Sequence, residues 1–283
     1  MQINNLCYRI LLVVLLVNVV DAKFHADFYK FLLGKFGKPI ADDLLRPDLG
    51  TKGSFGGGNP NATGHPIVVT HGLAGFAGLS KKSLYKKFLS YGQPQGTVFS
   101  TTYAKGEIYD SLQHGMQCDY VLKTRTLILA VHEYTKKTVN VIGVSMGSPI
   151  SRKAIMGGRC IDTGVNLGGS IAHLVNNFVS VAGANHGALF CSRSPFSNGI
   201  CSPLHGLDCR SRFIQEINAT PFKYGKNVFA IYSVDDEIVG LRNGCGELAS
   251  PFTGATPIQV SRWKHGAVIG QTTREQWAAL STL

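Results

Sequence analysis

The chain has 283 residues, of which 44% are hydrophobic and 16% are charged. This composition excludes a disordered, collagen-like or coiled-coil protein, and the length suits one large globular domain. The 28 Lys and Arg outnumber the 17 Asp and Glu, so the net charge of +11 favours anionic partners such as nucleic acid, heparin-like sugars or acidic lipid headgroups.

The N-terminus has the pattern of a secretory signal peptide. Arg9 precedes a short apolar run from Ile10 to Val20, and Ala22 ends a small-residue cleavage pattern. The run is well short of the roughly 20 residues that span a bilayer. We therefore expect residues 1–22 to be removed and residues 23–283 to form a single secreted, extracellular domain.

The cysteines agree with an oxidising compartment. Once Cys7 leaves with the signal, an even number remains, which predicts up to three disulfides of undetermined pairing. These cysteines are Cys118, Cys160, Cys191, Cys201, Cys209 and Cys245. No pair has the C-x-x-C spacing of a zinc or redox site, so no metal is expected. Two sequons, Asn61-Ala-Thr63 and Asn218-Ala-Thr220, are consistent with a glycoprotein.

After a peripheral lead-in over residues 23–64, with a short aromatic-striped helix and a glycine-rich loop, apolar runs alternate with amphipathic stretches. We expect strands at 66–70, 97–103, 139–144, 178–182, 228–234 and 258–260, and helices at 79–91, 118–134, 148–156 and at the C-terminus. A capping-box pattern at Thr272–Glu275 is expected to open the last helix. This alternation predicts an α/β fold with a mostly parallel sheet covered by helices on both faces.

One motif carries nucleophile chemistry. Gly143-x-Ser145-x-Gly147 follows an expected strand and precedes an expected helix, as a nucleophile elbow requires. The strained turn projects the serine hydroxyl above the sheet edge, and the two glycines allow the strand and helix to approach. The alternative is a structural turn with an incidental serine.

A serine nucleophile needs a histidine base and an acid, which follow it along the chain in the order acid, then histidine. The acids that end the strand at 228–234 are Asp235, Asp236 and Glu237, and His265 is the one histidine beyond them. His265 is expected in a loop after the last strand. Periodicity leaves the choice between Asp235 and Asp236 open.

The tetrahedral intermediate needs backbone N–H donors. One is expected from Met146, the residue after the nucleophile, and the other from Leu73 in the His71-Gly72-Leu73 loop. His71 precedes the serine, so we expect it to shape this loop and not to act as the base.

These residues carry a resemblance. The segments His71–Gly75, Gly143–Gly147, Asp236–Val239 and Lys264–Gly266, in that order, resemble the class 2 triacylglycerol lipase family, which is similar to small bacterial lipases. The resemblance spans about residues 64 to 280 and implies an α/β-hydrolase fold. It also implies that Asp236 is the catalytic acid.

One region departs from the family pattern. The segment 185–227 holds Cys191, Cys201 and Cys209 between two expected strands, where such hydrolases often insert a cap. We expect a disulfide-stapled insertion that is either a lid over Ser145 or a static surface loop. His186 is expected to line the pocket or to pack in the core.

These observations predict a secreted serine hydrolase of lipid esters, a triacylglycerol lipase or carboxylesterase, working through an acyl-enzyme on Ser145, Asp236 and His265 without cofactor or metal. The basic surface either contacts anionic lipid peripherally or is simply solvated. The alternatives are an acyltransferase or thioesterase with the same triad, and an inactive lipid- or heparin-binding homologue. Nucleic-acid binding is not expected, because the basic residues are scattered without a recognition motif.

Overall fold

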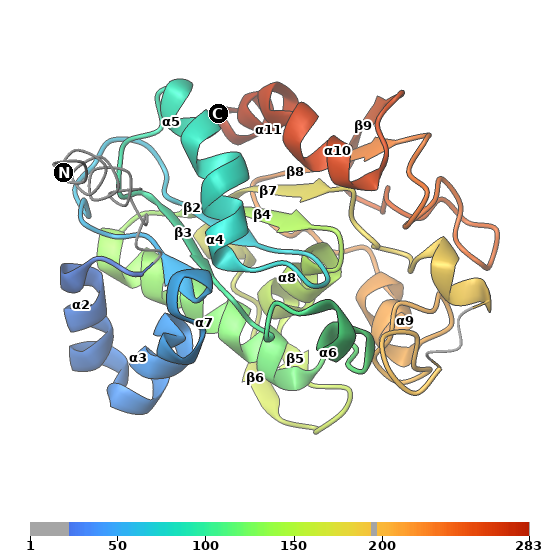
Figure 1. The fold of residues 1–283 in the computed structure, drawn as a ribbon, viewed down its shortest axis with the longest axis horizontal. Helices are drawn as coiled ribbons and strands as arrows, with labels where there is room; N and C mark the ends of the chain where they lie inside the picture. Colours follow the sequence, from blue (N-terminus) through green and yellow to red (C-terminus); the bar gives the residue numbers. More distant parts are fainter. Residues whose placement is uncertain (1–22, 194–196, 283) are drawn as a thin grey trace, which may run out of the picture.

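A seven-stranded sheet forms the centre of the computed structural model, which describes residues 23–193 and 197–282 (Figure 1). The expected signal peptide and Cys7 lie outside the described residues. The strand order is β1-β3-β2-β4-β7-β8-β9, and all neighbours pair in parallel except β1, which is antiparallel to β3. The strands are β1 (Ser54–Phe55), β2 (Ile67–Thr70), β3 (Val98–Thr101), β4 (Val139–Val144), β7 (Val175–Val181), β8 (Asn227–Ser233) and β9 (Thr256–Val260), with a separate hairpin of β5 (Gly158–Arg159) and β6 (Asn166–Gly168).

Helices cover both faces of this sheet (Figure 1). They are α2 (Ala26–Phe36), α3 (Lys38–Leu45), α4 (Ala77–Ser80), α5 (Lys86–Ser90), α6 (Ile108–Leu112), α7 (Cys118–Thr135), α8 (Gly147–Met156), α9 (Arg212–Asn218), α10 (His265–Gln271) and α11 (Thr273–Leu280). A π-helical turn, η2 (Lys81–Tyr85), joins α4 to α5, and 3₁₀ turns form η1 (Pro47–Lys52), η3 (Ala172–Leu174) and η4 (Leu189–Arg193). Within the described residues, no helix has the length and apolar character to cross a membrane.

The strands are apolar on both faces because each face packs under a different layer of helices. Val68 of β2 lies in one buried cluster with Ile128 of α7, whereas the adjacent Val69 lies in another with Phe88 of α5. Successive side chains of a strand point to opposite faces, so a sheet covered on both sides needs apolar residues at every position. The predicted α/β fold with a mostly parallel sheet is confirmed.

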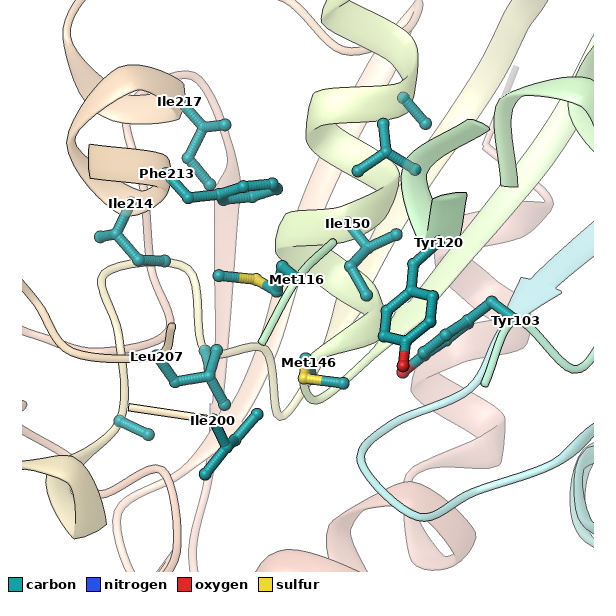
Figure 2. Close-up of a cluster of buried hydrophobic side chains, with 14 of the residues drawn as sticks. Tyr103, Met116, Tyr120, Met146, Ile150, Ile200, Leu207, Phe213, Ile214 and Ile217 are labelled. Atoms are coloured by element: carbon teal, nitrogen blue, oxygen red, sulfur yellow. The ribbon is translucent and has the colours of Figure 1, made fainter. Parts of the chain in front are cut away.

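A third buried cluster joins the insertion to α8, the helix that follows Ser145 (Figure 2). Side chains of α9, including Phe213 and Ile217, point toward Met116 and toward Ile150 of α8, and Tyr120 closes the far side. Each of these side chains is 5% exposed or less. This apolar contact fixes α9 to the body of the domain.

The lead-in contributes to the core and is not peripheral. Phe28 of α2 is fully buried, and its ring lies 5.0 Å from that of Phe99 in β3. The stretch expected as a glycine-rich loop holds β1, which extends the sheet at Ser54 and Phe55. A two-residue strand leaves too short a pattern to detect in the sequence.

Two local expectations are wrong. Thr272 is the N-cap residue of α11, but no capping box forms, because the Thr272 hydroxyl donates to Val268 O at 2.7 Å in the preceding helix. That helix, α10, was not expected, and its first residue is His265, which was assigned to a loop. Gly266 and Gly270 interrupt the helical pattern of this stretch and lower its helix propensity.

Three disulfides form, as the even cysteine count predicts. Cys118–Cys160 joins the start of α7 to the segment after α8. Cys191–Cys201 closes a loop within the insertion, and Cys209–Cys245 ties the insertion to the segment after β8.

Candidate active site

Ser145 lies in a strained turn between β4 and α8. Its φ of 52° is in the left-handed region, which costs a non-glycine residue of the order of 1–3 kcal/mol. The surroundings hold this conformation in place, since the Ser145 amide donates to Val181 O of β7 at 2.9 Å. Ser145 is 7% exposed as a residue, so the turn sits within the packed core and presents little more than its hydroxyl.

Steric contacts explain why glycine stands at positions 143 and 147, on either side of Ser145. A Cβ on Gly147 would lie 2.3 Å from Thr70 O, and a Cβ on Gly143 would lie 2.5 Å from Ser148 Cα. Both neighbours are backbone atoms, which cannot swing aside. The motif therefore specifies close approach of the elbow to β2 and α8, as expected.

The structure brings Ser145, His265 and Asp236 together. His265 Nε2 lies 3.0 Å from Ser145 Oγ, and His265 Nδ1 lies 2.7 Å from Asp236 Oδ2. Asp236 Oδ1 accepts the amides of Ile238 at 3.0 Å and Val239 at 2.9 Å. Burial raises the pKa of Asp236, but the bonds from His265 and these two amides outweigh it, so the pKa lies below its usual value. The carboxylate is therefore ionised at neutral pH.

The two acids beside Asp236 each accept a hydrogen bond from a backbone amide of the segment that carries His265. Asp235 Oδ2 accepts the Arg262 amide at 2.7 Å, and Glu237 Oε2 accepts the His265 amide at 3.0 Å. Reasoning from the sequence treated these acids as competitors for one position and missed both contacts. The run of three acids was the one available signal.

His71 is buried, and both of its ring nitrogens are bonded to groups other than Ser145. Its ring stacks on Tyr103 with centroids 4.0 Å apart. The Tyr103 amide donates to Nε2 at 3.3 Å, which assigns the ring proton to Nδ1, and Nδ1 then donates to Gly72 O at 2.8 Å. Burial lowers the pKa of His71 to about 4, despite the bond to Gly72 O. His71 is neutral at pH 7.

The loop after β2 has a fixed peptide orientation. Gly72 O also accepts the Gly75 amide at 3.0 Å. Because the N–H and C=O of a trans peptide point in opposite directions, the Leu73 N–H points away from these two donors. Among the described residues, neither the Leu73 nor the Met146 amide has an acceptor. A Cβ on Gly72 would lie 2.9 Å from Ser145 Cβ, so the loop passes directly beside Ser145.

The lead-in contacts the backbone around Tyr103, the residue that packs on this loop. Arg46, itself at a left-handed φ of 55°, donates from Nη1 to Thr102 O at 2.6 Å and to Ala104 O at 2.7 Å. These carbonyls flank Tyr103, the residue that stacks on His71. A segment upstream of the motifs thus supports the His71–Gly75 loop indirectly, through the backbone on either side of Tyr103.

Ser145 and His265 open into a cleft of about 310 Å³ with mainly apolar walls. The apolar lining consists of Leu73, Phe76, Leu79, Leu84, Ile108, Val144, Phe190, Leu207, Ile238, Val239 and Ile269. Phe190 and Leu207 come from the insertion. His186 is not part of this lining and lies instead 3.9 Å from Glu247.

One group in the described chain has the spacing of metal ligands, namely Cys118, Cys160 and Asp162. The two sulfurs form a disulfide, and Asp162 Oδ2 accepts the Cys118 amide at 3.0 Å. The group is therefore a structural link at the start of α7.

Comparison with known proteins adds a family and a fold. The family described as Lipase (class 2) matches residues 64–278. Among solved structures, Aspergillus fumigatus lipase B is 17% identical with a TM-score of 0.57, over 78% of this chain and 52% of that chain. Mature Bacillus licheniformis lipase BlEst2 is 14% identical with a TM-score of 0.52, over 79% and 94% of the two chains. A Paleococcus ferrophilus monoacylglycerol lipase is 13% identical with a TM-score of 0.50, over 80% and 96%.

This chain spans about half the length of the Aspergillus lipase. No curated protein sequence matches it. At such low identities the similar structures establish the fold, which is that of the α/β-hydrolases.

Proposed function

The chain belongs to the class 2 lipase family of α/β-hydrolases, and we propose that it is a serine hydrolase that cleaves carboxylic ester bonds of lipids, as a triacylglycerol lipase or carboxylesterase. One observation carries the proposal. Ser145 and His265 line an apolar cleft, and His265 hydrogen-bonds both Ser145 and Asp236. This is the arrangement that activates a serine hydroxyl toward an acyl carbonyl.

The reaction follows from the positions of these groups. Ser145 Oγ attacks the acyl carbonyl while His265 Nε2 takes its proton, and ionised Asp236 stabilises the imidazolium and holds its orientation. The Leu73 and Met146 amides donate to the oxyanion of the tetrahedral intermediate. His265 then protonates the leaving alcohol, and a water activated by the same histidine releases the fatty acid from the acyl-enzyme.

The oxyanion hole is prepared before substrate binds. His71 and the Gly75 amide hold Gly72 O, which orients the Leu73 N–H on the opposite side of the peptide. Fixed dipoles lower the barrier because they need not reorganise as charge develops. A neutral His71 with a single defined tautomer serves this purpose.

The rim of the cleft suits a lipid surface. Leu79 is 48% exposed, Ile108 is 60% exposed and the adjacent Tyr109 is 76% exposed. Exposed Lys82 and Lys86 lie on the continuous α4–η2–α5 helix that also carries Leu79. We propose that this rim contacts aggregated lipid peripherally, with the lysines drawn to anionic headgroups.

The insertion forms a wall of the cleft and stays in place. Phe213 on α9 is buried against the body of the domain, and Cys209–Cys245 ties the segment to a second loop. Phe190 and Leu207 then present apolar surface to the cleft. Limited proteolysis should give the same cleavage between residues 185 and 227 with and without detergent, whereas new cleavage on adding detergent would indicate a moving lid.

We also propose that residues 23–283 are a secreted catalytic domain, with which three disulfides are compatible. The two sequons then differ. Asn61 is exposed, whereas Asn218 Nδ2 donates to Asn185 O and to Ile214 O, both at 2.8 Å. A glycan on Asn218 Nδ2 would replace one of the two hydrogens that these bonds use, so glycosylation is proposed at Asn61.

Hydrolysis of p-nitrophenyl butyrate and of emulsified long-chain triglyceride, by wild type and Ser145→Ala side by side, tests the function. Wild-type hydrolysis that disappears in the variant supports the proposal, and the ratio between substrates separates lipase from esterase. A folded wild type no more active than Ser145→Ala on either ester contradicts it, and the inactive lipid- or heparin-binding homologue then becomes the better account.

A further inference from the structure

The proposed base projects from an exposed part of the molecule. None of the five residues of β9 is buried, and residues 261–264, which lead from β9 to α10, are all exposed. Yet His265 must keep its ring within 3.0 Å of Ser145 Oγ. Ile258 of β9 and Val268 of α10 reach a buried apolar cluster on either side, but no residue of 261–264 belongs to it. Other contacts must therefore fix the connection itself.

Asp235 holds the first end of the segment. Its carboxylate accepts the Arg262 amide at 2.7 Å, and Arg262 has a left-handed φ of 73°. A non-glycine residue pays a free-energy cost for this conformation and keeps it only where the surroundings enforce it. The bond from Asp235 is such a constraint on an otherwise exposed residue.

Glu237 holds the second end. The first amides of a helix lack acceptors within the helix, and the N-cap of α10 is Lys264, which has no side-chain acceptor and makes no capping bond. Glu237 Oε2 accepts the His265 amide at 3.0 Å and so supplies the missing cap from another element. This bond lowers the pKa of Glu237 below its ordinary value. A carboxylate at a helix N-terminus is also favoured by the helix dipole.

We propose that Asp235 and Glu237 form a carboxylate clamp, a pair of positioning residues that fasten the 262–265 backbone to the segment bearing Asp236. This inference rests on the proposed function. The three consecutive acids make different contacts with the segment that carries His265. Asp236 bonds the imidazole itself, while the residues before and after it fix the backbone that carries the imidazole. The clamp thus sets the reach of His265 to Ser145.

Alanine and amide variants of the clamp test it. Glu237→Gln and Asp235→Asn keep an oxygen that accepts an N–H, whereas Glu237→Ala and Asp235→Ala do not. On soluble p-nitrophenyl butyrate we expect Glu237→Ala to lower kcat about tenfold and Asp235→Ala about threefold, with KM unchanged, because small misplacements of a catalytic group are costly. The amide variants should stay within about twofold of wild type.

The double alanine variant should lose about 100-fold in kcat, since the histidine segment then has neither anchor. Glu133→Ala is the matched control. It removes the same charge from a surface pair with Lys136 on α7 and should leave kcat unchanged. Thermal melting of each variant verifies that it is folded.

The possible outcomes distinguish a failure of the clamp proposal from a failure of the proposed ester hydrolase function. Alanine variants that are slow in kcat, normal in KM and restored by the amides support the clamp. Folded alanine variants with wild-type kcat overturn it, as do amide variants that lose as much as the alanines. A wild type that hydrolyses no ester overturns the proposed function, and the clamp with it.

Discussion

The proposed nucleophile, Ser145, and the proposed base, His265, come from regions of opposite character. All six residues of β4 are buried, and α8 is buried from Gly147 through Ile155. The proposed base, His265, is the first residue of α10 and follows β9, where no residue is buried, and the exposed residues 261–264. Close packing surrounds Ser145, whereas the connection before His265 is held by hydrogen bonds to Asp235 and Glu237, and apolar packing resumes only at Val268 of α10. The two regions should therefore fail in different ways when they are altered.

The largest effect is expected within the acid run. Asp236→Asn leaves the shape intact but removes the charge that stabilises the imidazolium, so kcat should fall about 10⁴-fold. Asp235→Asn, one residue earlier, should remain close to wild type. Steady-state hydrolysis of p-nitrophenyl butyrate compares the pair, and similar losses in both would contradict the assignment of the acid.

Replacing one glycine in each region with alanine compares how tightly the two regions are packed. Gly147→Ala would place a Cβ 2.3 Å from Thr70 O, so the free energy of unfolding should fall by about 3 kcal/mol or more. Gly266→Ala in α10 meets no atom within 4 Å and should gain about 0.5 kcal/mol from helix propensity. Urea unfolding measures both. Equal destabilisation would mean that the base region is packed as tightly as the elbow.

Because His71 is buried, we expect it to make the free energy of unfolding depend on pH. Its folded pKa of about 4 lies below the unfolded value of 6.5, so between these values the unfolded chain binds more protons. Stability is therefore complete above pH 6.5 and declines as the pH falls toward 4. Lowering the pH to 5 should cost about 2 kcal/mol through this residue.

His71→Phe should remove that share of the pH dependence while keeping the stack on Tyr103. It should also lower kcat about 10-fold or more, because Gly72 O loses one of its two donors and the Leu73 amide is less well oriented. Unfolding curves at pH 7.5 and 5.0 for both proteins give the difference. An unchanged pH slope in the variant would argue against a buried, neutral His71.

Arg46→Ala is expected to have the smallest effect on activity. It frees Thr102 O and Ala104 O behind Tyr103, so kcat should fall about threefold through the oxyanion loop. Arg210→Ala, an exposed arginine paired with Asp208, is the control and should have no effect. A kcat unaffected by Arg46→Ala would show that the lead-in does not influence catalysis.

The sequence predicts the buried region better than the exposed one, for a physical reason. Burial imposes patterns that can be read, such as the apolar run of β4 and the glycines around Ser145, and chain order then identifies His265. The contacts of Asp235 and Glu237 go to backbone amides, which nearly every residue type carries, so the run of three acids does not reveal their partners. Helix α10 was missed because its glycines weaken the helical signal, and Asp236 was chosen over Asp235 through the family resemblance alone.

Labelling with a fluorophosphonate, followed by mass spectrometry of the labelled peptide, tests the central claim most directly. The account predicts a single adduct on Ser145 in the wild type, no adduct in Ser145→Ala and a strongly slowed reaction in Asp236→Asn. A folded wild type that resists the reagent, or that is labelled at another residue, would contradict the account.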